Sequence, residues 1–175
     1  MGRKIKKEFV IFVEGASEEL YFLTLNQQEF VRKSSYKLVV QNCQGLDNSL
    51  AVALEGKKYK KLLNASSKIA FVFDKDHLSQ EQFNKLLGNP NIIAFSNPKF
   101  ELWLLAHFEK LRVNYTDVLI DLKKYIPDYS KKSNQIADCA KVSHKAVENT
   151  VNFRELSYVK ICTSVAEIIE EIEKE

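Results

Sequence analysis

The chain has 175 residues, 45% of them apolar and 28% charged, which is the composition of one globular domain with a sizeable hydrophobic core. Its apolar runs fall short of the ~20 residues needed to cross a bilayer, and the run that follows its basic start is interrupted by Glu14, which is unlike a signal peptide. We therefore expect a soluble, cytoplasmic protein, and the net charge of +3 permits a polyanionic partner without requiring one.

The first half of the chain contains four short apolar runs that we interpret as strands. They are rich in β-branched and aromatic residues and have no alternation of apolar and polar positions, which is typical of strands buried on both faces of a sheet. These runs cover residues 8–13, 36–43, 68–74 and 91–97.

Helical patterns separate these strands. Ser17 is a suitable N-cap for a first helix, whose apolar side extends to Phe30. A second helix is expected over residues 50–63, and a third, short one over residues 79–89. Because strands and helices alternate, the pattern predicts an α/β fold with a parallel four-stranded sheet flanked by helices.

The second half of the chain changes to helical patterns. Residues 100–108 form a helix that is apolar almost all round, and helices with short polar breaks follow from Asp117 onward. The last of them, over residues 157–173, is amphipathic. We expect residues 1–110 to form the α/β core and residues 111–175 to form a helical C-terminal extension packed on that core, in one compact domain.

The three cysteines, Cys43, Cys139 and Cys162, lie far apart in the chain. They are odd in number, contain no C-x-x-C pair and have no histidine at the spacing of a zinc site. The sequence therefore indicates neither a disulfide framework nor a structural zinc ion. We expect three buried, free thiols.

Carboxylates follow two of the predicted strands directly. Glu14 comes at the end of the first strand, and Asp74 and Asp76 come at the end of the third. Ligands of open parallel sheets bind at the carboxyl ends of the strands, so we expect these three side chains to meet at one edge of the sheet. Glu18, in the first turn of the next helix, is close enough in sequence to join them.

Such a group of carboxylates suggests a metal ion. Three of them at one edge repel one another by a few kcal/mol unless a cation joins them. Oxygen ligands without a nearby histidine or cysteine favour magnesium, manganese or calcium over zinc or copper. The alternative is structural, because acidic residues are common in turns and in first helical turns, and for Glu18 this alternative stays open.

Other polar residues near the strand ends are candidates for supporting roles. Glu101, just after the fourth strand, can orient a water molecule or only anchor a helix start, and Lys99 beside it can contact a phosphate. Lys131 and Lys132 lie in a polar segment that can bring positive charge to a reacting phosphate, or they are simply solvated. His77 can act as a proton shuttle or be an ordinary surface residue.

Four stretches of the sequence resemble the RloB-like family of bacterial proteins. The most specific part lies between Asn97 and Trp103, where asparagine, proline, phenylalanine, glutamate and tryptophan follow one another closely. The core of this family is similar to the Toprim domain. The four stretches are "VEGASEELYF" from Val13, "FVFDKD" from Phe71, "SNPKFELWLLAHFE" from Ser96 and "SYVKICTSVAEIIEEI" from Ser157.

The resemblance implies an activity and a set of residues. The Toprim motif has a glutamate after the first strand and an aspartate-x-aspartate after a later one, which Glu14, Asp74 and Asp76 match. Glu18 is similar to a further glutamate of related nucleases of the overcoming-lysogenization-defect type. The resemblance implies a nuclease that cleaves DNA or RNA with Mg²⁺ or Mn²⁺ on these four residues. It also implies a role in phage defence by abortive infection, with an ATPase partner encoded nearby. Further catalytic candidates are Glu101 and Lys132.

Two other functions stay open. A Toprim-like chain can be a non-catalytic regulatory or binding subunit that works with an ATPase. Its docking surfaces would be the apolar helix that contains Trp103 and the final amphipathic helix. A primase-like or topoisomerase-like activity is disfavoured, because the chain has no room for the extra domains of such enzymes. The sequence has no glycine-rich phosphate loop, so we do not expect this chain itself to hydrolyse ATP.

Overall fold

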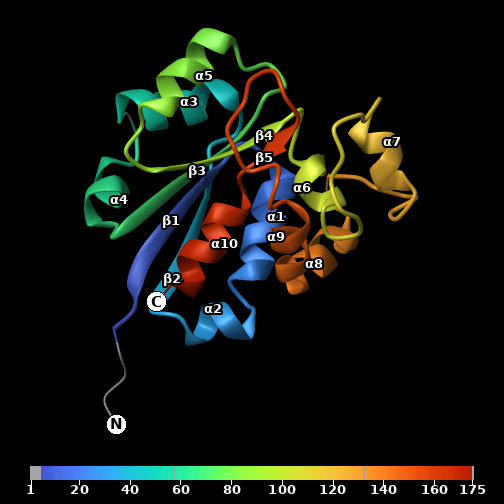
Figure 1. The fold of residues 1–175 in the computed structure, drawn as a ribbon. Coiled ribbons are helices and arrows are strands. Elements are labelled where there is room, and N and C mark those ends of the chain that lie inside the picture. The colour runs from blue at the N-terminus through green and yellow to red at the C-terminus, as the bar shows by residue number, and fades with distance from the viewer. Residues whose placement is uncertain (1–4, 57, 132, 175) are drawn as a thin grey trace.

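The computed structural model describes residues 5–56, 58–131 and 133–174, and its centre is a sheet with helices on both faces (Figure 1). Within these residues the sheet has five strands in the order β2-β1-β3-β4-β5, of which the first four are parallel and the last is antiparallel. The predicted α/β class and four parallel strands are confirmed, but the prediction of only four strands is wrong. The strands are β1 (Lys7–Val13), β2 (Tyr36–Asn42), β3 (Lys68–Asp74), β4 (Ile92–Asn97) and β5 (Cys162–Thr163).

Strand β1 shows why the predicted strands are apolar without a break. Phe9, Ile11 and Val13 belong to the core on one face of the sheet, whereas Val10 and Phe12 belong to the core on the other face. None of these side chains is more than 1% exposed. A strand covered on both faces has no solvent side, and its sequence therefore lacks the alternation of a surface strand.

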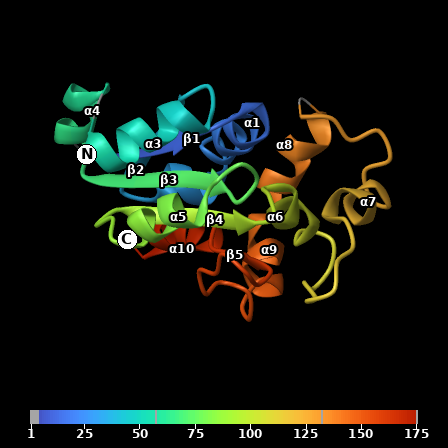
Figure 2. The same ribbon diagram turned by 90° about the horizontal axis from the view of Figure 1, so that it is seen from above.

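Helices form one layer on each face of the sheet, as Figures 1 and 2 show. Helix α7 (Val118–Lys123) lies beside α6, at the end of the molecule toward which β3 and β4 point (Figure 2). One face carries α1 (Ala16–Leu25), α2 (Glu29–Lys33), α6 (Glu101–Leu105), α8 (Asn134–Lys141), α9 (Ser143–Asn149) and α10 (Ala166–Glu173). The other face carries α3 (Leu46–Glu55), α4 (Lys60–Ala65) and α5 (Gln80–Leu87).

The first helix is shorter than predicted and has a different start. Ser17 is not its N-cap, because the helix begins one residue earlier and Gly15 takes the capping position. The Ser17 hydroxyl instead lies 3.4 Å from the Tyr129 hydroxyl. The helix ends at Leu25, and the apolar residues up to Phe30 continue into the separate helix α2. A tertiary contact of the serine thus replaces the local cap.

The middle helices show how local breaks decide the ends of elements. The helix predicted over residues 50–63 is two helices, because Gly56 adopts a left-handed φ of 60° that ends α3. The predicted short helix is confirmed as α5. Its N-cap is Ser79, whose Oγ accepts a hydrogen bond from the backbone N–H of Gln82 at 3.2 Å.

The prediction of a single amphipathic helix over residues 157–173 is wrong for the first half of this range. Only α10 is helical there, and the preceding β5 pairs antiparallel with β4. Ser164 stabilises this pairing, because its Oγ accepts from the N–H of Phe95 at 2.9 Å and donates to the carbonyl of Ile93 at 3.0 Å. Hydrogen bonds at the edge of β4 therefore outweigh the helical pattern of this segment.

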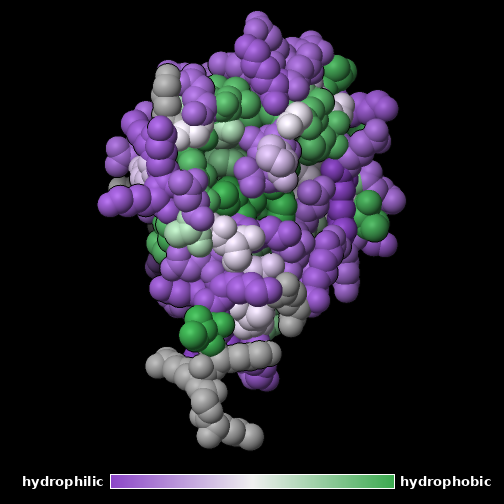
Figure 3. Space-filling model, turned by 90° about the vertical axis from the view of Figure 1, so that its left-hand side faces the viewer, coloured by the Kyte–Doolittle hydropathy of each residue, from purple (hydrophilic) through white to green (hydrophobic). Residues whose placement is uncertain are grey.

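The interior and the surface divide the residue types as expected for a globular domain. All three cysteines are buried and free, which confirms that prediction. The side of the molecule shown in Figure 3 is mostly hydrophilic, with hydrophobic residues gathered near its centre. None of the described helices has the length and apolar character needed to span a bilayer.

Candidate functional site

The acidic residues that follow β1 and β3 meet at one edge of the sheet. These strands are parallel neighbours, so their carboxyl ends lie side by side. The backbone N–H of Asp74 donates to Glu14 Oε1 at 3.2 Å, which holds the Glu14 side chain across the end of β3. Asp74 Oδ1 is buried and has no hydrogen-bond partner among the described residues. Buried polar atoms are nearly always paired, so this unpaired oxygen makes Asp74 a candidate for a functional residue.

Helix α1 adds Glu18 to this edge. Glu18 is only 7% exposed, and a Cβ atom at Gly15 would lie 3.2 Å from its Oε2. The absence of a side chain at Gly15 therefore leaves room for the carboxylate. The side chain of the next residue, Glu19, contacts the end of β2 instead, where Asn42 Nδ2 donates a hydrogen bond to Glu19 Oε2 at 2.9 Å. Of these two adjacent glutamates, only Glu18 belongs to the acidic edge.

Asp76 lies at the rim of this edge, in the turn after β3. The backbone of the turn is fixed by the segment after β4, because the N–H of Lys75 donates to Ser96 at 2.9 Å and that of Asp76 donates to Pro98 at 3.2 Å. The Asp76 side chain itself is 65% exposed, and its Oδ2 lies 3.8 Å from Nε2 of the exposed His77. Asp76 thus combines a fixed backbone with a side chain that reaches solvent.

Glu101 lies at the same edge, at the start of α6, and is 6% exposed. The Tyr129 hydroxyl donates to Glu101 Oε1 at 2.9 Å and is also close to Ser17 of α1. Tyr129 therefore links the two helices that flank the acidic residues. Sequence reasoning missed this role, because Tyr129 lies in a polar loop without periodicity and only the fold brings it to Glu101.

A buried hydrogen-bonded contact in the core connects α1 and α6 and fixes their relative position. The Tyr21 hydroxyl of α1 lies 3.1 Å from His107 Nε2, and His107 Nδ1 lies 2.9 Å from the backbone oxygen of Trp103 in α6. Burial lowers the pKa of His107 to about 4, so its imidazole is neutral at pH 7. This contact joins the helix that carries Glu18 to the helix that carries Glu101.

Two cavities open onto the carboxylates, and both are lined by Asp74, Asp76 and Lys131. The first, which we call the acidic cavity, has a volume of about 260 Å³, and its ionisable lining residues are Glu14, Glu18, Asp74, Asp76, His77 and Lys131. The second, which we call the mixed cavity, has a volume of about 270 Å³, and its ionisable lining residues are Asp74, Asp76, Lys99, Glu101, Lys123, Tyr129 and Lys131.

Burial and crowding make negative charge unfavourable at this edge. Burial raises the pKa of the Glu14 carboxyl to about 7, and the hydrogen bond from the Asp74 backbone offsets only a part of that shift. Burial also raises the pKa of Glu18, and the carboxylate of Glu101 adds to that shift. The pKa of Asp74 is raised well above its usual range by burial and by the carboxylates of Glu18 and Glu14. A bound cation would relieve this unfavourable charge.

The donor atoms of this edge fit a hard divalent cation. Carboxylate oxygens are the ligands that Mg²⁺ and Mn²⁺ prefer, and Asp74 Oδ1 has acceptor capacity that no described residue uses. As arranged, no three His, Cys, Asp or Glu side chains within residues 5–56, 58–131 and 133–174 stand close enough together to enclose an ion. Side chains at the rim, such as that of Asp76, would therefore have to rotate toward Asp74 on binding.

The structure places the remaining candidates in different surroundings. Lys131 lines both cavities and Lys99 lines the mixed cavity, whereas Lys132 lies outside the described residues. His77 reaches the acidic cavity from the turn after β3 with a side chain that is 88% exposed. Lys123 of α7 also lines the mixed cavity. Sequence reasoning missed Lys123 as a site residue, because a lysine at the end of a short helix looks like any solvated residue.

Comparison with known protein families supports the relationship indicated by the sequence motifs. The family model described as RloB-like protein matches residues 9–172, a range that contains all the carboxylates described above. Neither a curated protein nor a solved structure matches the chain. Because the family model covers nearly the whole sequence, the chain belongs to the RloB-like protein family.

Proposed function

We propose that this protein is a metal-dependent nuclease that hydrolyses phosphodiester bonds of DNA or RNA. The observation that carries the proposal is the buried, unpaired Asp74 Oδ1 in a cavity that it shares with Glu14, Glu18 and Asp76. A carboxylate with a purely structural role would be hydrogen-bonded or solvated at both oxygens. Mg²⁺ or Mn²⁺, when bound, would supply an acidified water and neutralise negative charge on the scissile phosphate.

The residues of the proposed site would have different roles, which follow from their positions. Asp74 is the last residue of β3, has a buried Oδ1 and would serve as the fixed anchor. Asp76 reaches solvent at the rim and can adjust to the cation and the substrate. Tyr129 holds Glu101 in one orientation by its hydrogen bond. The residues that would hold the cation are Glu14, Glu18, Asp74 and Asp76.

The same proposal includes a Toprim-like core and a role in bacterial phage defence. It is supported by the order of the acidic residues, with Glu14 after β1 and the pair Asp74 and Asp76 after β3, and by membership of the RloB-like family. In this role the nuclease would act with an ATPase partner and cause abortive infection.

The test of the proposal is a cleavage assay with labelled DNA and RNA in Mg²⁺, in Mn²⁺ and in EDTA. We expect cleavage with either metal, and no cleavage in EDTA or by Asp74→Asn. The matched control is Glu19→Gln, because Glu19 neighbours Glu18 in sequence but contacts Asn42. This control should cleave like the wild type. Equal activity of the wild type and Asp74→Asn would contradict the proposal.

A non-catalytic regulatory or binding subunit is the second candidate. The observation in its favour is that the described carboxylates do not already surround a cation-sized site. Calorimetric titration with Mn²⁺ separates the two functions. Binding by the wild type that is lost in Asp74→Asn supports the nuclease, whereas the absence of binding at any manganese concentration supports the regulatory subunit.

A further inference from the structure

The two cavities at the acidic edge have different charge. Among their described lining residues, the acidic cavity has four carboxylates and one lysine, whereas the mixed cavity has three carboxylates and three lysines. A cation is attracted to the acidic cavity, and an anion is better accommodated in the mixed cavity. Because the cavities share Asp74 and Asp76, an anion in the mixed cavity would lie next to a cation in the acidic one.

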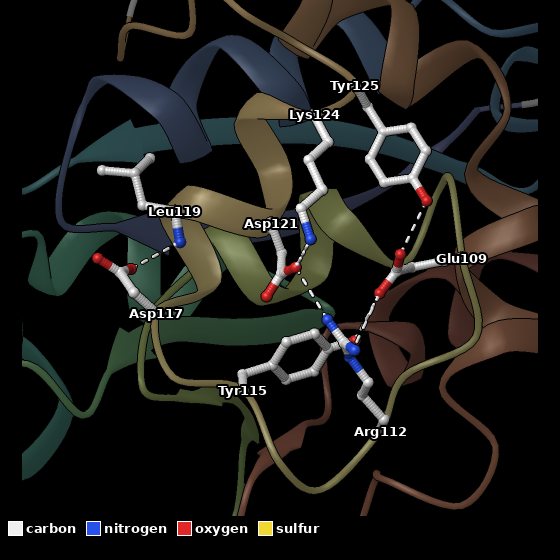
Figure 4. A network of polar contacts seen from close by, with 8 residues as sticks. All are labelled: Glu109, Arg112, Tyr115, Asp117, Leu119, Asp121, Lys124 and Tyr125. Carbon is white, nitrogen blue, oxygen red and sulfur yellow. Dashed lines mark hydrogen bonds and ion pairs between the residues drawn. The ribbon is translucent and has the colours of Figure 1, made fainter.

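One wall of the mixed cavity belongs to a segment that is ordered by its own contacts. We call residues 109–125 the arm, and Figure 4 shows its polar network. Glu109 accepts hydrogen bonds from the hydroxyls of Tyr115 at 3.0 Å and Tyr125 at 2.8 Å, which ties the two ends of the arm together. The arm therefore has a defined conformation without a ligand, as a preformed binding surface requires.

Two adjacent lysines of the arm have different surroundings. Lys124 Nζ donates to Asp121 Oδ1 at 2.5 Å, and the same oxygen accepts from Arg112 Nη2 at 2.8 Å (Figure 4). Lys123 lies next to Leu119 in the wall of the mixed cavity and has no ion pair with any described residue. The network uses the charge of Lys124 to build the arm and leaves the charge of Lys123 at the cavity.

A second lysine faces the mixed cavity from the sheet. Lys99 follows β4, half-buried, in the segment whose Pro98 carbonyl accepts the hydrogen bond from the backbone of Asp76. Lys99 is therefore tied to the position of the acidic residues, and Lys123 approaches from the arm. Lys99 and Lys123 thus come from different parts of the fold to line one small cavity, together with Lys131.

A further cavity among the described residues is lined by basic side chains, some of which are already engaged by contacts within the fold. It has a volume of about 540 Å³, lies at the amino-terminal edge of the sheet and is lined in part by Lys6, Lys7, Arg32 and Lys33. Lys6 Nζ already donates to three backbone carbonyls, and Lys33 is paired with Glu29 at 2.5 Å. The charges of Lys6 and Lys33 are therefore already used within the fold.

We infer that the mixed cavity binds a backbone phosphate of a nucleic acid, with Lys99 and Lys123 as its contacts, so that the arm holds the strand beside the acidic residues. This inference rests on the proposed function, because the phosphate belongs to the proposed substrate. Contacts to phosphates position a strand without reading its bases. The site therefore takes DNA or RNA by their shared phosphodiester backbone.

The test measures binding separately from cleavage. In an Asp74→Asn Asp76→Asn protein, which should not cleave, the affinity for fluorescein-labelled single strands of ~12 nucleotides of DNA and of RNA is measured by anisotropy over a series of salt concentrations. Lys123→Gln and Lys99→Gln are compared with Lys145→Gln, because Lys145 is an exposed lysine of α9 that lines neither cavity. The wild-type protein and Lys123→Gln are assayed for cleavage in parallel, which tests the proposed function independently.

We expect Lys123→Gln and Lys99→Gln each to weaken binding by roughly three- to tenfold. Each should also lower the slope of log affinity against log salt by about 0.7, as expected for one lost phosphate contact to a single strand. Lys145→Gln should change neither quantity. The inference is overturned if the protein binds neither strand, if Lys123→Gln binds like the parent, or if Lys145→Gln weakens binding as much as Lys123→Gln. A protein that binds in the expected way but does not cleave would refute only the proposed function.

Discussion

The two edges of the parallel sheet differ in whether their charged groups have partners. At the amino-terminal edge, Lys6 donates hydrogen bonds to three carbonyls and Lys68 is paired with Glu171 at 2.8 Å. At the carboxyl-terminal edge, Asp74 keeps a buried oxygen without a partner, and burial raises the pKa of Glu14. The first edge stabilises the fold, whereas the second tolerates unfavourable charge, as functional sites do.

The largest effect is expected for Asp74→Asn, which removes the central negative charge of the carboxyl-terminal edge. Cleavage should fall at least about a thousandfold, because the proposed anchor for the cation is lost. The melting temperature of the metal-free protein should stay the same or rise, because repulsion among the carboxylates decreases. Single-turnover cleavage and a thermal melt in EDTA measure the two effects. A variant that loses both activity and several degrees of stability would contradict this account of the edge.

Glu14→Gln should stabilise the metal-free protein at high pH. The pKa of Glu14 is about 7 in the folded protein against an ordinary value of 4.5, so the folded state holds this proton more tightly than the unfolded state. The resulting contribution to stability is complete below pH 4.5 and is lost as the pH rises through 7. At about pH 8, removing the carboxyl should raise the free energy of unfolding by up to about 3 kcal/mol, with little effect at about pH 5.

Urea denaturation in EDTA at the two pH values measures this difference. An equal effect of Glu14→Gln at both values would show that the charge of Glu14 is not what destabilises the edge. Added Mg²⁺ gives the matching control, because a cation that binds the ionised carboxylates should stabilise the wild type more at high pH than at low pH.

Lys6→Met tests the opposite edge, where we expect a loss of stability without a loss of function. Three backbone carbonyls lose their donor, and the free energy of unfolding should fall by about 1 to 2 kcal/mol. The exposed Lys61 of α4 offers the matched control, since Lys61→Met should have little effect on stability. Urea denaturation and the cleavage assay are run on both variants, and reduced cleavage by folded Lys6→Met would refute the separation of the two edges.

The smallest expected effect is that of Tyr129→Phe, which keeps the ring and removes the hydrogen bond to Glu101 Oε1. Cleavage should fall roughly three- to tenfold, while the free energy of unfolding changes by less than about 1 kcal/mol. A cleavage time course and urea denaturation measure the two quantities. Unchanged cleavage would show that the orientation of Glu101 does not matter to the site.

The sequence alone predicted the four parallel strands, because burial on both faces requires apolar residues at every position and leaves a continuous pattern. It also led to Glu14, Asp74 and Asp76 as candidates, because they lie at or just after the ends of strands that share one edge of the sheet. Such residues are fixed by chain order once the strands are known. Strand β5 was not predicted, because its pairing with β4 depends on hydroxyl contacts such as those of Ser164.

Only the tertiary structure decided how the rest of the site is assembled. Tyr129 and Lys123 lie in loops and short helices without a local pattern, and long-range packing brings them to the acidic edge. The fold also separated Glu18, which lines the acidic cavity, from Glu19, which contacts Asn42. The physical reason is that hydrophobic periodicity encodes which face of an element is buried, whereas contacts between distant polar side chains form only after the elements have packed.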